Sequence, residues 1–192
     1  MSQLALFGTS ADPPTCGHQV LLKGLLERYP AVATWASDNP LKRHGAPLEQ
    51  RALLLATLVA AIGNPRLELA QDLSSPWAIE TLERAQRRWP AAELVFVVGS
   101  DLAGQIPQWK QAQQILQCCR LAIAPRGGWP FTAEQRQNLE QLGARLEVLD
   151  LQVPATASSL VRSQLDPSQI PAAVLPALLE HNLYGLAPSP PR

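Results

Sequence analysis

The chain has 192 residues and equal numbers of basic and acidic side chains, 16 of each, so its formal net charge is zero. That length suits one domain with a sizeable core, and the charge balance gives no overall field that would favour nucleic acid or a membrane as partner. The three cysteines, Cys16, Cys118 and Cys119, have neither CxxC nor metal-ligand spacing, which favours a reducing, cytoplasmic location. No apolar run reaches the about 18 residues of a membrane span, and no signal-peptide pattern is found, so we expect an unexported protein.

Short runs rich in valine, isoleucine, leucine and alanine alternate along the chain with segments of helical period. Strands are predicted over residues 3–8, 31–36, 66–70, 93–98, 120–124 and 145–151. Helices are predicted over residues 17–28, 47–62, 76–89, 107–116, 132–142 and 171–181, several of them beginning at proline, which suits a first helical turn. This alternation predicts an α/β fold: a Rossmann-like, doubly wound parallel sheet of five to six strands with helices on both faces.

The same pattern predicts one domain over residues 1–187. Its C-terminal part, at about residues 158–183, is expected to be helical. The proline-rich tail, residues 188–192, is predicted to be disordered.

In an open parallel sheet, ligands bind beyond the carboxyl ends of the strands. The first predicted strand is followed by GTSADPPTCGH, residues 8–18, whose small residues let backbone N–H groups approach a ligand closely. Gly17 and His18 fall at the start of a helix, where free N–H groups and a partial positive charge favour an anion. The spacing Thr15-x-Gly17-His18 therefore predicts a phosphate near both side chains. The structural alternative is an ordinary N-cap threonine and a surface histidine.

Two other polar stretches also follow predicted strands. Lys42 lies in NPLK, after the second predicted strand, and Asp101 lies in VGSDL, after the fourth. Asp101 would face the shared crevice and contact ribose hydroxyls or a metal, unless it only caps a helix. Near the carboxyl end, ASSLVR presents two hydroxyls and an arginine one turn later, a combination suited to phosphate oxygens.

In these stretches the sequence resembles the (H/T)xGH nucleotidyltransferase superfamily, and within it bacterial nicotinate-nucleotide adenylyltransferase. The first loop resembles the family's GGTFDPxHxGH, WAIETL its YTxxTL, VGSDL its GxDxL and ASSLVR its SSTxxR. The likeness runs from about residue 4 to residue 183. Ala11 stands where the family has phenylalanine, Thr15 replaces the first histidine and Ser159 replaces the last threonine. Thr15 is the alternative that the wider superfamily allows, as in phosphopantetheine adenylyltransferase.

The resemblance implies transfer of AMP from ATP to nicotinate mononucleotide, giving deamido-NAD and pyrophosphate in NAD biosynthesis, by one nucleotidyltransferase domain. It implies Mg²⁺ bound with the ATP phosphates rather than in a protein metal site. The implied catalytic residues are His18, Thr15, Lys42 and Arg162. The implied ATP-binding residues are Gly8, Thr9, Ser10, Gly17, His18, Gly99, Asp101, Ser158, Ser159 and Arg162. The implied pyridine-nucleotide residues are Asp12, Lys42, Thr81 and Trp109, with Trp109 as a stacking surface for the nicotinate ring.

Several alternatives stay open. The nearest is a nicotinamide mononucleotide or phosphopantetheine adenylyltransferase of the same superfamily, and a more distant one is a non-catalytic nucleotide-binding module. A flavodoxin-like electron carrier would share the sheet but would not account for the serine-arginine segment. The expected partners are small-molecule substrates, without nucleic acid or membrane, and the oligomeric state, a homo-oligomer included, is left open.

Overall fold

The computed structural model describes residues 2–39, 42–151, 153–154, 158–164 and 166–185, without the side chains of residues 159, 160 and 164. The predicted tail, residues 188–192, and the central Pro-Leu pair of NPLK lie outside the described residues. Within these ranges no helix has the length and apolar character that crossing a bilayer requires.

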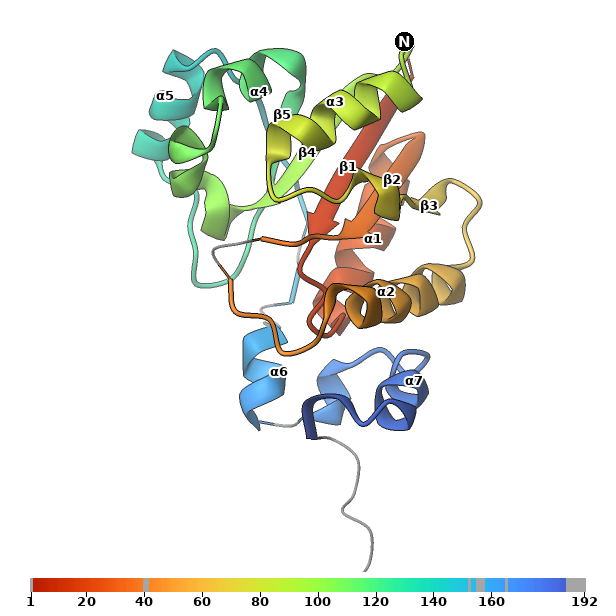
Figure 1. Cartoon of the computed structure of the whole chain (residues 1–192). Helices are drawn as coiled ribbons and strands as arrows, with labels where there is room; N and C mark the ends of the chain where they lie inside the picture. Colours follow the sequence, from red (N-terminus) through yellow and green to blue (C-terminus); the bar gives the residue numbers. More distant parts are fainter. Residues whose placement is uncertain (1, 40–41, 152, 155–157, 165, 186–192) are drawn as a thin grey trace, which may run out of the picture.

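Six parallel strands form one sheet, which confirms the predicted fold class (Figure 1). The strands are β1 (Gln3–Thr9), β2 (Ala31–Ala36), β3 (Leu67–Leu69), β4 (Glu93–Gly99), β5 (Arg120–Ala124) and β6 (Arg145–Val148). Their order across the sheet is β3-β2-β1-β4-β5-β6. The central strand β1 pairs through Ala5 with Val32 of β2 and Val95 of β4. β6 ends three residues before the predicted boundary, although the Leu149 N–H still bonds to the Ile123 carbonyl.

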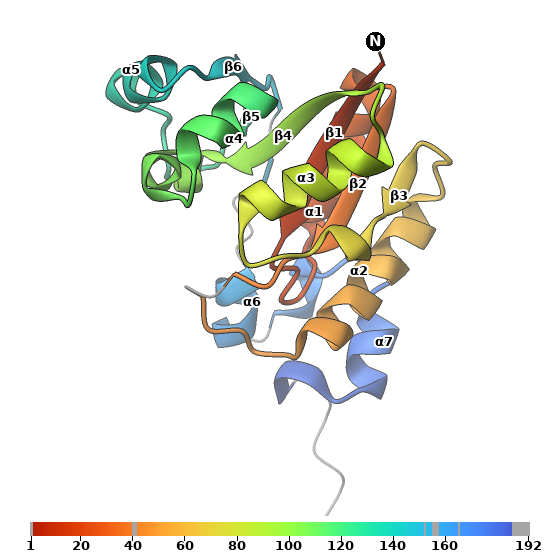
Figure 2. The ribbon, with the colours of Figure 1, turned by 45° about the horizontal axis from the view of Figure 1, so that its top comes forward.

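Helices cover both faces of the sheet, as Figure 2 shows. The helices are α1 (Cys16–Arg28), α2 (Leu48–Ile62), α3 (Ala78–Arg88), α4 (Ala112–Cys118), α5 (Ala133–Gln141), α6 (Ser158–Gln164) and α7 (Leu175–Glu180), with short 3₁₀ segments η1 (Gln71–Leu73), η2 (Ser100–Gln108), η3 (Pro167–Gln169) and η4 (Leu183–Gly185). Side chains alternate along β1, so Ala5 and Phe7 enter a core with α1, α2 and α7. Leu4 and Leu6 enter the opposite core with α3, α4 and α5.

Two predicted helix starts are wrong. The helix predicted from Pro107 begins at Ala112, because Pro107 belongs to the 3₁₀ segment η2 and Gln111, just before the helix, has a left-handed backbone with φ of 58°. The helix predicted from Pro171 begins at Leu175, since the carbonyl of Pro171 accepts the N–H groups of Val174 and Leu175 in a preceding turn. In both places the proline lies in a turn or 3₁₀ segment, and the regular helix begins four or five residues later.

Candidate active site

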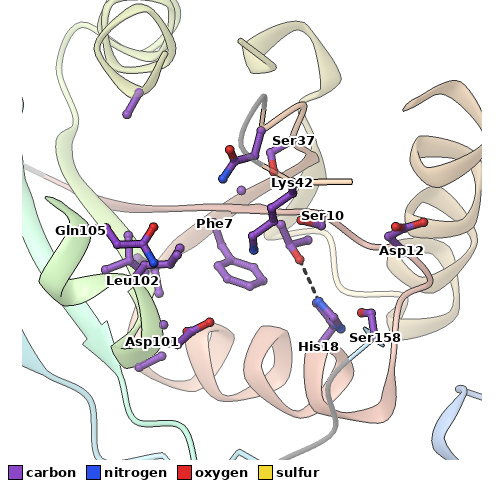
Figure 3. A pocket seen from close by; sticks show the side chains of 18 of the residues that line it. Phe7, Ser10, Asp12, His18, Ser37, Lys42, Asp101, Leu102, Gln105 and Ser158 are labelled. Atoms are coloured by element: carbon purple, nitrogen blue, oxygen red, sulfur yellow. Dashed lines mark hydrogen bonds between the residues drawn. The ribbon is translucent and has the colours of Figure 1, made fainter. Parts of the chain in front are cut away.

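The strand order reverses at β1, because the chain fills the β2 side of the sheet first and then crosses to β4. Ligands of open α/β sheets bind beyond the carboxyl ends of the strands at such a switch point. A cavity of about 730 Å³ lies there, and its walls come from the segments that follow β1, β2, β4 and β5 and from α6. Its size is within the range of small-molecule sites. Figure 3 shows it from close by.

Most residues that the sequence predicts for the site line this one cavity. They are Gly8, Thr9, Ser10, Asp12, Gly17, His18, Lys42, Thr81, Gly99, Asp101, Trp109, Ser158 and Arg162. Thr15 does not line it, and the prediction for the Ser159 side chain falls outside the described residues. The topology therefore brings together residues that lie up to 154 positions apart, from Gly8 to Arg162.

His18 is held by hydrogen bonds at both ring nitrogens. Its Nδ1 lies 3.0 Å from the backbone nitrogen of Thr15, and its Nε2 lies 2.8 Å from the hydroxyl of Thr9. A backbone N–H can only donate, so Nδ1 must be the acceptor, and the proton of the neutral ring sits on Nε2. His18 is the third residue of α1, where this contact to the residue before the helix forms one half of a capping box. The Nε2–H therefore donates to the Thr9 hydroxyl, and both side chains line the cavity.

The electrostatic surroundings keep His18 neutral. Burial, followed by the positive charges of Arg126 and Lys42, lowers the pKa of His18 from 6.5 to about 4. The ring is therefore uncharged near pH 7. It acts there as a fixed hydrogen-bond donor, and the nearby positive charge comes from the lysine and the arginine.

Thr15 takes a different position from the one that the sequence suggests. Its side chain is fully buried, and its hydroxyl lies 2.8 Å from Nδ1 of His18, on the side of the ring away from Thr9. Thr15 therefore contacts the back of the imidazole and does not face the cavity. The arrangement makes it a support for the orientation of His18.

The Asp12 residue is 1% exposed, and both carboxylate oxygens accept hydrogen bonds from other parts of the chain. Oδ1 accepts from the Tyr184 hydroxyl at 2.7 Å and the Ala46 N–H at 3.1 Å, and Oδ2 accepts from the Gly45 N–H at 2.7 Å. In Figure 3 the carboxylate points away from His18 and Lys42. Direct contact of this carboxylate with a pyridine nucleotide stays a prediction, and its present partners favour a structural role.

Arg162 is anchored to Asp12 by one end of its guanidinium. Nη1 donates to the Asp12 carbonyl and lies 3.1 Å from Oδ2 of the same residue. The side chain keeps 27% of its surface exposed and lines the cavity. The neighbouring Ser158 hydroxyl donates to the Pro13 carbonyl at 2.8 Å. Both contacts fasten α6 to the loop that follows β1.

A second pair of charges lies across the cavity. Asp101 follows β4, and its Oδ2 lies 2.7 Å from Nη1 of Arg126, which follows β5. The Ser100 hydroxyl accepts the Arg126 N–H at 3.0 Å and donates to the Trp129 carbonyl at 2.6 Å. Figure 3 shows His18 and Asp101 on either side of Phe7. This hydrogen-bonded turn fixes the wall formed by the ends of β4 and β5.

Aromatic side chains line the part of the cavity near η2 and α3. Trp109 packs edge-on against Phe96, with ring centroids 6.4 Å apart. The Lys110 ammonium lies 5.0 Å from the ring centroid of Trp77. The hydroxyl of Thr81 donates to the Leu73 carbonyl at 2.9 Å and is buried, so its contact with a pyridine nucleotide stays a prediction.

Sequence reasoning missed three buried or half-buried polar residues around Asp12. Arg51 donates to the carbonyls of Ser10 and Ser37, at 2.7 Å and 2.8 Å, and so joins the ends of β1 and β2. Burial lowers the pKa of Arg51 and also that of His44, whose Nδ1 lies 3.7 Å from Oδ2 of Asp12. Tyr184 reaches Asp12 from 172 positions away. No local pattern signals such long-range pairs.

Known proteins resemble this chain in sequence and in fold. Residues 6–162 match the cytidylyltransferase-like family. A probable nicotinate-nucleotide adenylyltransferase of Synechocystis sp. is 34% identical over 197 residues, covering 95% of this chain and 98% of the relative. A protein of the same name from Rhodopirellula baltica is 33% identical over 135 residues, which is 66% of this chain and 63% of that protein.

Solved structures share the fold. The nicotinic acid mononucleotide adenylyltransferase of Plasmodium falciparum, complexed with NaAD, has a TM-score of 0.77 at 17% identity over 97% of this chain and 98% of its own. A putative nicotinate-nucleotide adenylyltransferase from Vibrio parahaemolyticus has a TM-score of 0.65 at 19% identity over 96% of both chains. With a family match over most of its length and a full-length relative at 34% identity, the chain belongs to the cytidylyltransferase-like family of nucleotidyltransferases.

Proposed function

We propose that this chain transfers AMP from ATP to nicotinate mononucleotide and so makes deamido-NAD and pyrophosphate for NAD biosynthesis. The observation that carries the proposal is the fixed Nε2–H donor of His18. It lies at a cavity of about 730 Å³ whose walls also carry Lys42, Arg126 and Arg162. The names of the full-length relative and of the structural neighbours support the choice of reaction. An ATP analogue (APC) bound to the Plasmodium falciparum enzyme supports ATP as donor.

The cations and small residues of the cavity suit two phosphorylated substrates. We assign Lys42, Ser158, Ser159 and Arg162 to the triphosphate of ATP, with charge-assisted bonds as the main attraction. The loop that follows β1 and the turn at Gly99 bring backbone N–H groups close to the nucleotide, and Asp101 faces its ribose. The contacting residues are Gly8 and Thr9 at the end of β1, Ser10 in the loop, Gly17 in α1, Gly99 at the end of β4 and Asp101.

The reaction needs no protein nucleophile. A phosphate oxygen of nicotinate mononucleotide attacks the α-phosphorus of ATP in line, the bond to the bridging oxygen breaks, and pyrophosphate leaves with that oxygen. The Nε2–H of His18 would donate to the transferring phosphate, where negative charge grows in the transition state. Thr15, through Nδ1, would hold the ring in place. Catalysis then rests on positioning two anions and on preorganised donors.

The described residues fit Mg²⁺ as part of the nucleotide substrate. Among them, no group of three or more histidine, cysteine, aspartate or glutamate side chains is arranged to hold a metal ion. The carboxylates among the cavity-lining residues, Asp12 and Asp101, are both paired with arginines. When bound, the ion would neutralise charge on the pyrophosphate oxygens, and the side chains named above would orient the phosphates that carry it.

The aromatic end of the cavity suits the pyridine ring. Trp109 offers a face for stacking, and the Lys110 ammonium next to Trp77 supplies positive charge that matches a nicotinate carboxylate better than an amide. We propose Asp12, Lys42 and Thr81 as further contributors on the pyridine-nucleotide side. For Asp12 and Thr81 the role is indirect, through the loops that their buried side chains hold.

The cellular location and the domain organisation are proposed from the cysteines and from the two hydrophobic cores. All three cysteines are free thiols, which supports a reducing compartment and therefore the cytoplasm. The two cores share the strands β1, β2, β4 and β5 of one sheet, which supports residues 1–187 as a single nucleotidyltransferase domain.

The proposal is tested by pyrophosphate release from ATP and magnesium with three acceptors in parallel: nicotinate mononucleotide, nicotinamide mononucleotide and phosphopantetheine. We expect the highest kcat/KM with nicotinate mononucleotide. A higher value with either other acceptor would assign the chain to another branch of the superfamily. Nucleotide binding without pyrophosphate release would indicate a binding module.

A further inference from the structure

We propose that Tyr184, near the carboxyl end of the chain, is a positioning residue for nucleotide binding that acts on Arg162 through Asp12. The inference rests on the proposed assignment of Arg162 to the triphosphate of ATP. It makes the segment after α7 a part of the active site, although this segment lies outside the residues that match the family. Figures 1 and 2 show α7, which precedes this segment, beside α2.

The three side chains form a continuous chain of contacts. The Tyr184 hydroxyl donates to Oδ1 of Asp12 at 2.7 Å. The other carboxylate oxygen, Oδ2, lies 3.1 Å from Nη1 of Arg162, and the same Nη1 donates to the Asp12 carbonyl. One aspartate therefore receives the tyrosine on one oxygen and the arginine on the other.

Packing around Gly45 brings the tyrosine and the arginine together. A Cβ atom at Gly45 would lie 2.8 Å from Cδ of Arg162 and 2.9 Å from Cε1 of Tyr184, closer than real side chains tolerate. Both side chains thus cross the same face of Gly45. Tyr184 has a left-handed backbone with φ of 60°, a conformation that a bulky residue keeps only where its surroundings hold it.

The negative charge of the buried Asp12 carboxylate links the Tyr184 hydroxyl to nucleotide binding by Arg162. The negative charge of Asp12 is shared among the tyrosine hydroxyl, two backbone N–H groups and the arginine. Without the hydroxyl, more of that charge faces Arg162 and competes with a phosphate for the guanidinium. Because burial and the bond to Asp12 raise the pKa of Tyr184, the phenol keeps its proton and remains a donor across the working pH range.

The test replaces Tyr184 by phenylalanine, which keeps the ring and removes only the hydroxyl. We expect KM for ATP to rise about 3- to 10-fold, the range that corresponds to one hydrogen bond. We expect kcat to stay within about 2-fold and KM for nicotinate mononucleotide to rise less than KM for ATP, because Tyr184 reaches the pyridine side of the cavity only indirectly, through the loop that Asp12 holds. Calorimetric titration with ATP and magnesium, without acceptor, should show the same loss of affinity.

The chain supplies a matched control in its one other tyrosine. Tyr29 is 2% exposed and is not among the residues that line the cavity. It follows α1 at the end of the sheet away from the cavity. Tyr29→Phe should leave KM and the ATP affinity unchanged. Gly45→Ala is the second variant: it keeps both tyrosines but displaces Tyr184 and Arg162, and it should raise KM for ATP at least as much.

Selective weakening of ATP binding in Tyr184→Phe and Gly45→Ala, but not in Tyr29→Phe, would support the inference. The inference is overturned if Tyr184→Phe binds ATP like the wild type, whether or not its melting temperature falls. A wild-type chain that binds ATP but shows no turnover with nicotinate mononucleotide would contradict the proposed function, and the calorimetric comparison would still decide the role of Tyr184.

Discussion

The assignment of the proton to Nε2 of His18 makes a graded prediction for substitutions at this residue. Because Nδ1 accepts the Thr15 N–H, only Nε2 offers a donor at the cavity. His18→Ala removes this donor. Glutamine can place its amide NH₂ near the position of Nε2, whereas the shorter asparagine reaches only the position of Nδ1. We therefore expect glutamine to retain more activity than asparagine or alanine.

The expected magnitude follows from the loss of one preorganised donor to a developing charge. Such a loss reduces kcat by about 10²-fold, equivalent to about 2.7 kcal/mol of barrier stabilisation. We expect His18→Ala and His18→Asn to fall by at least that factor, and His18→Gln to fall by about 10-fold. KM for both substrates should change little, because the donor acts mainly in the transition state.

The assay is steady-state pyrophosphate release at saturating ATP, magnesium and nicotinate mononucleotide near pH 7. His181, an exposed residue after α7, supplies the control variant His181→Gln, which should match the wild type. Near-normal turnover in His18→Ala would remove His18 from the mechanism. Asparagine performing as well as glutamine would refute the assignment of the proton to Nε2.

Three further predictions concern the surroundings of His18 and the packing of Gly8 in β1. Thr15→Val removes the hydroxyl behind His18 but keeps the backbone bond, so kcat should fall about 3- to 10-fold; an unchanged kcat would show that the backbone bond alone orients the ring. The pKa of His18 is about 4 in the folded chain, against the 6.5 of an unperturbed histidine, so between these pH values the unfolded chain binds a proton that the folded chain does not. Stability should therefore fall as pH is lowered from 6.5 to 4, by up to about 3 kcal/mol, and urea unfolding of His18→Gln should lack this contribution; equal pH slopes in both proteins would refute it. Gly8→Ala would place a Cβ 2.6 Å from the buried Trp35 ring, so urea unfolding should show a loss of about 1–3 kcal/mol; wild-type stability would contradict this close packing of Gly8 against Trp35.

The fold was predictable because the buried strands carry a strong local signal. Val95 to Val98 are apolar throughout, as a strand covered on both faces requires, and the intervening helices show a clear period. The start of α4 was not predictable, since the left-handed backbone of Gln111 and the 3₁₀ turns before it arise from packing. Proline at position 107 pointed to a helix start that the chain reaches only at Ala112.

Residues that directly follow strands line the cavity, as sheet topology predicts, whereas side chains that meet across the fold were missed. His18, Lys42 and Asp101 come after the first, second and fourth strands, so sheet topology alone brings them to one edge. The Asp12 contact with Tyr184 joins residues 172 positions apart and has no periodic or spacing signal. The burial of Thr15 behind His18 likewise depends on side-chain orientation, which the motif T-x-G-H does not specify.

The most direct test of the proposed reaction is the fate of oxygen atoms in a single turnover. The chain is mixed with ATP, magnesium and nicotinate mononucleotide labelled with ¹⁸O in its phosphate, and the masses of both products are determined. Attack of the acceptor phosphate on the α-phosphorus predicts deamido-NAD that carries all the label and pyrophosphate that carries none. Labelled pyrophosphate, or no dinucleotide product at all, would contradict the proposed adenylyl transfer.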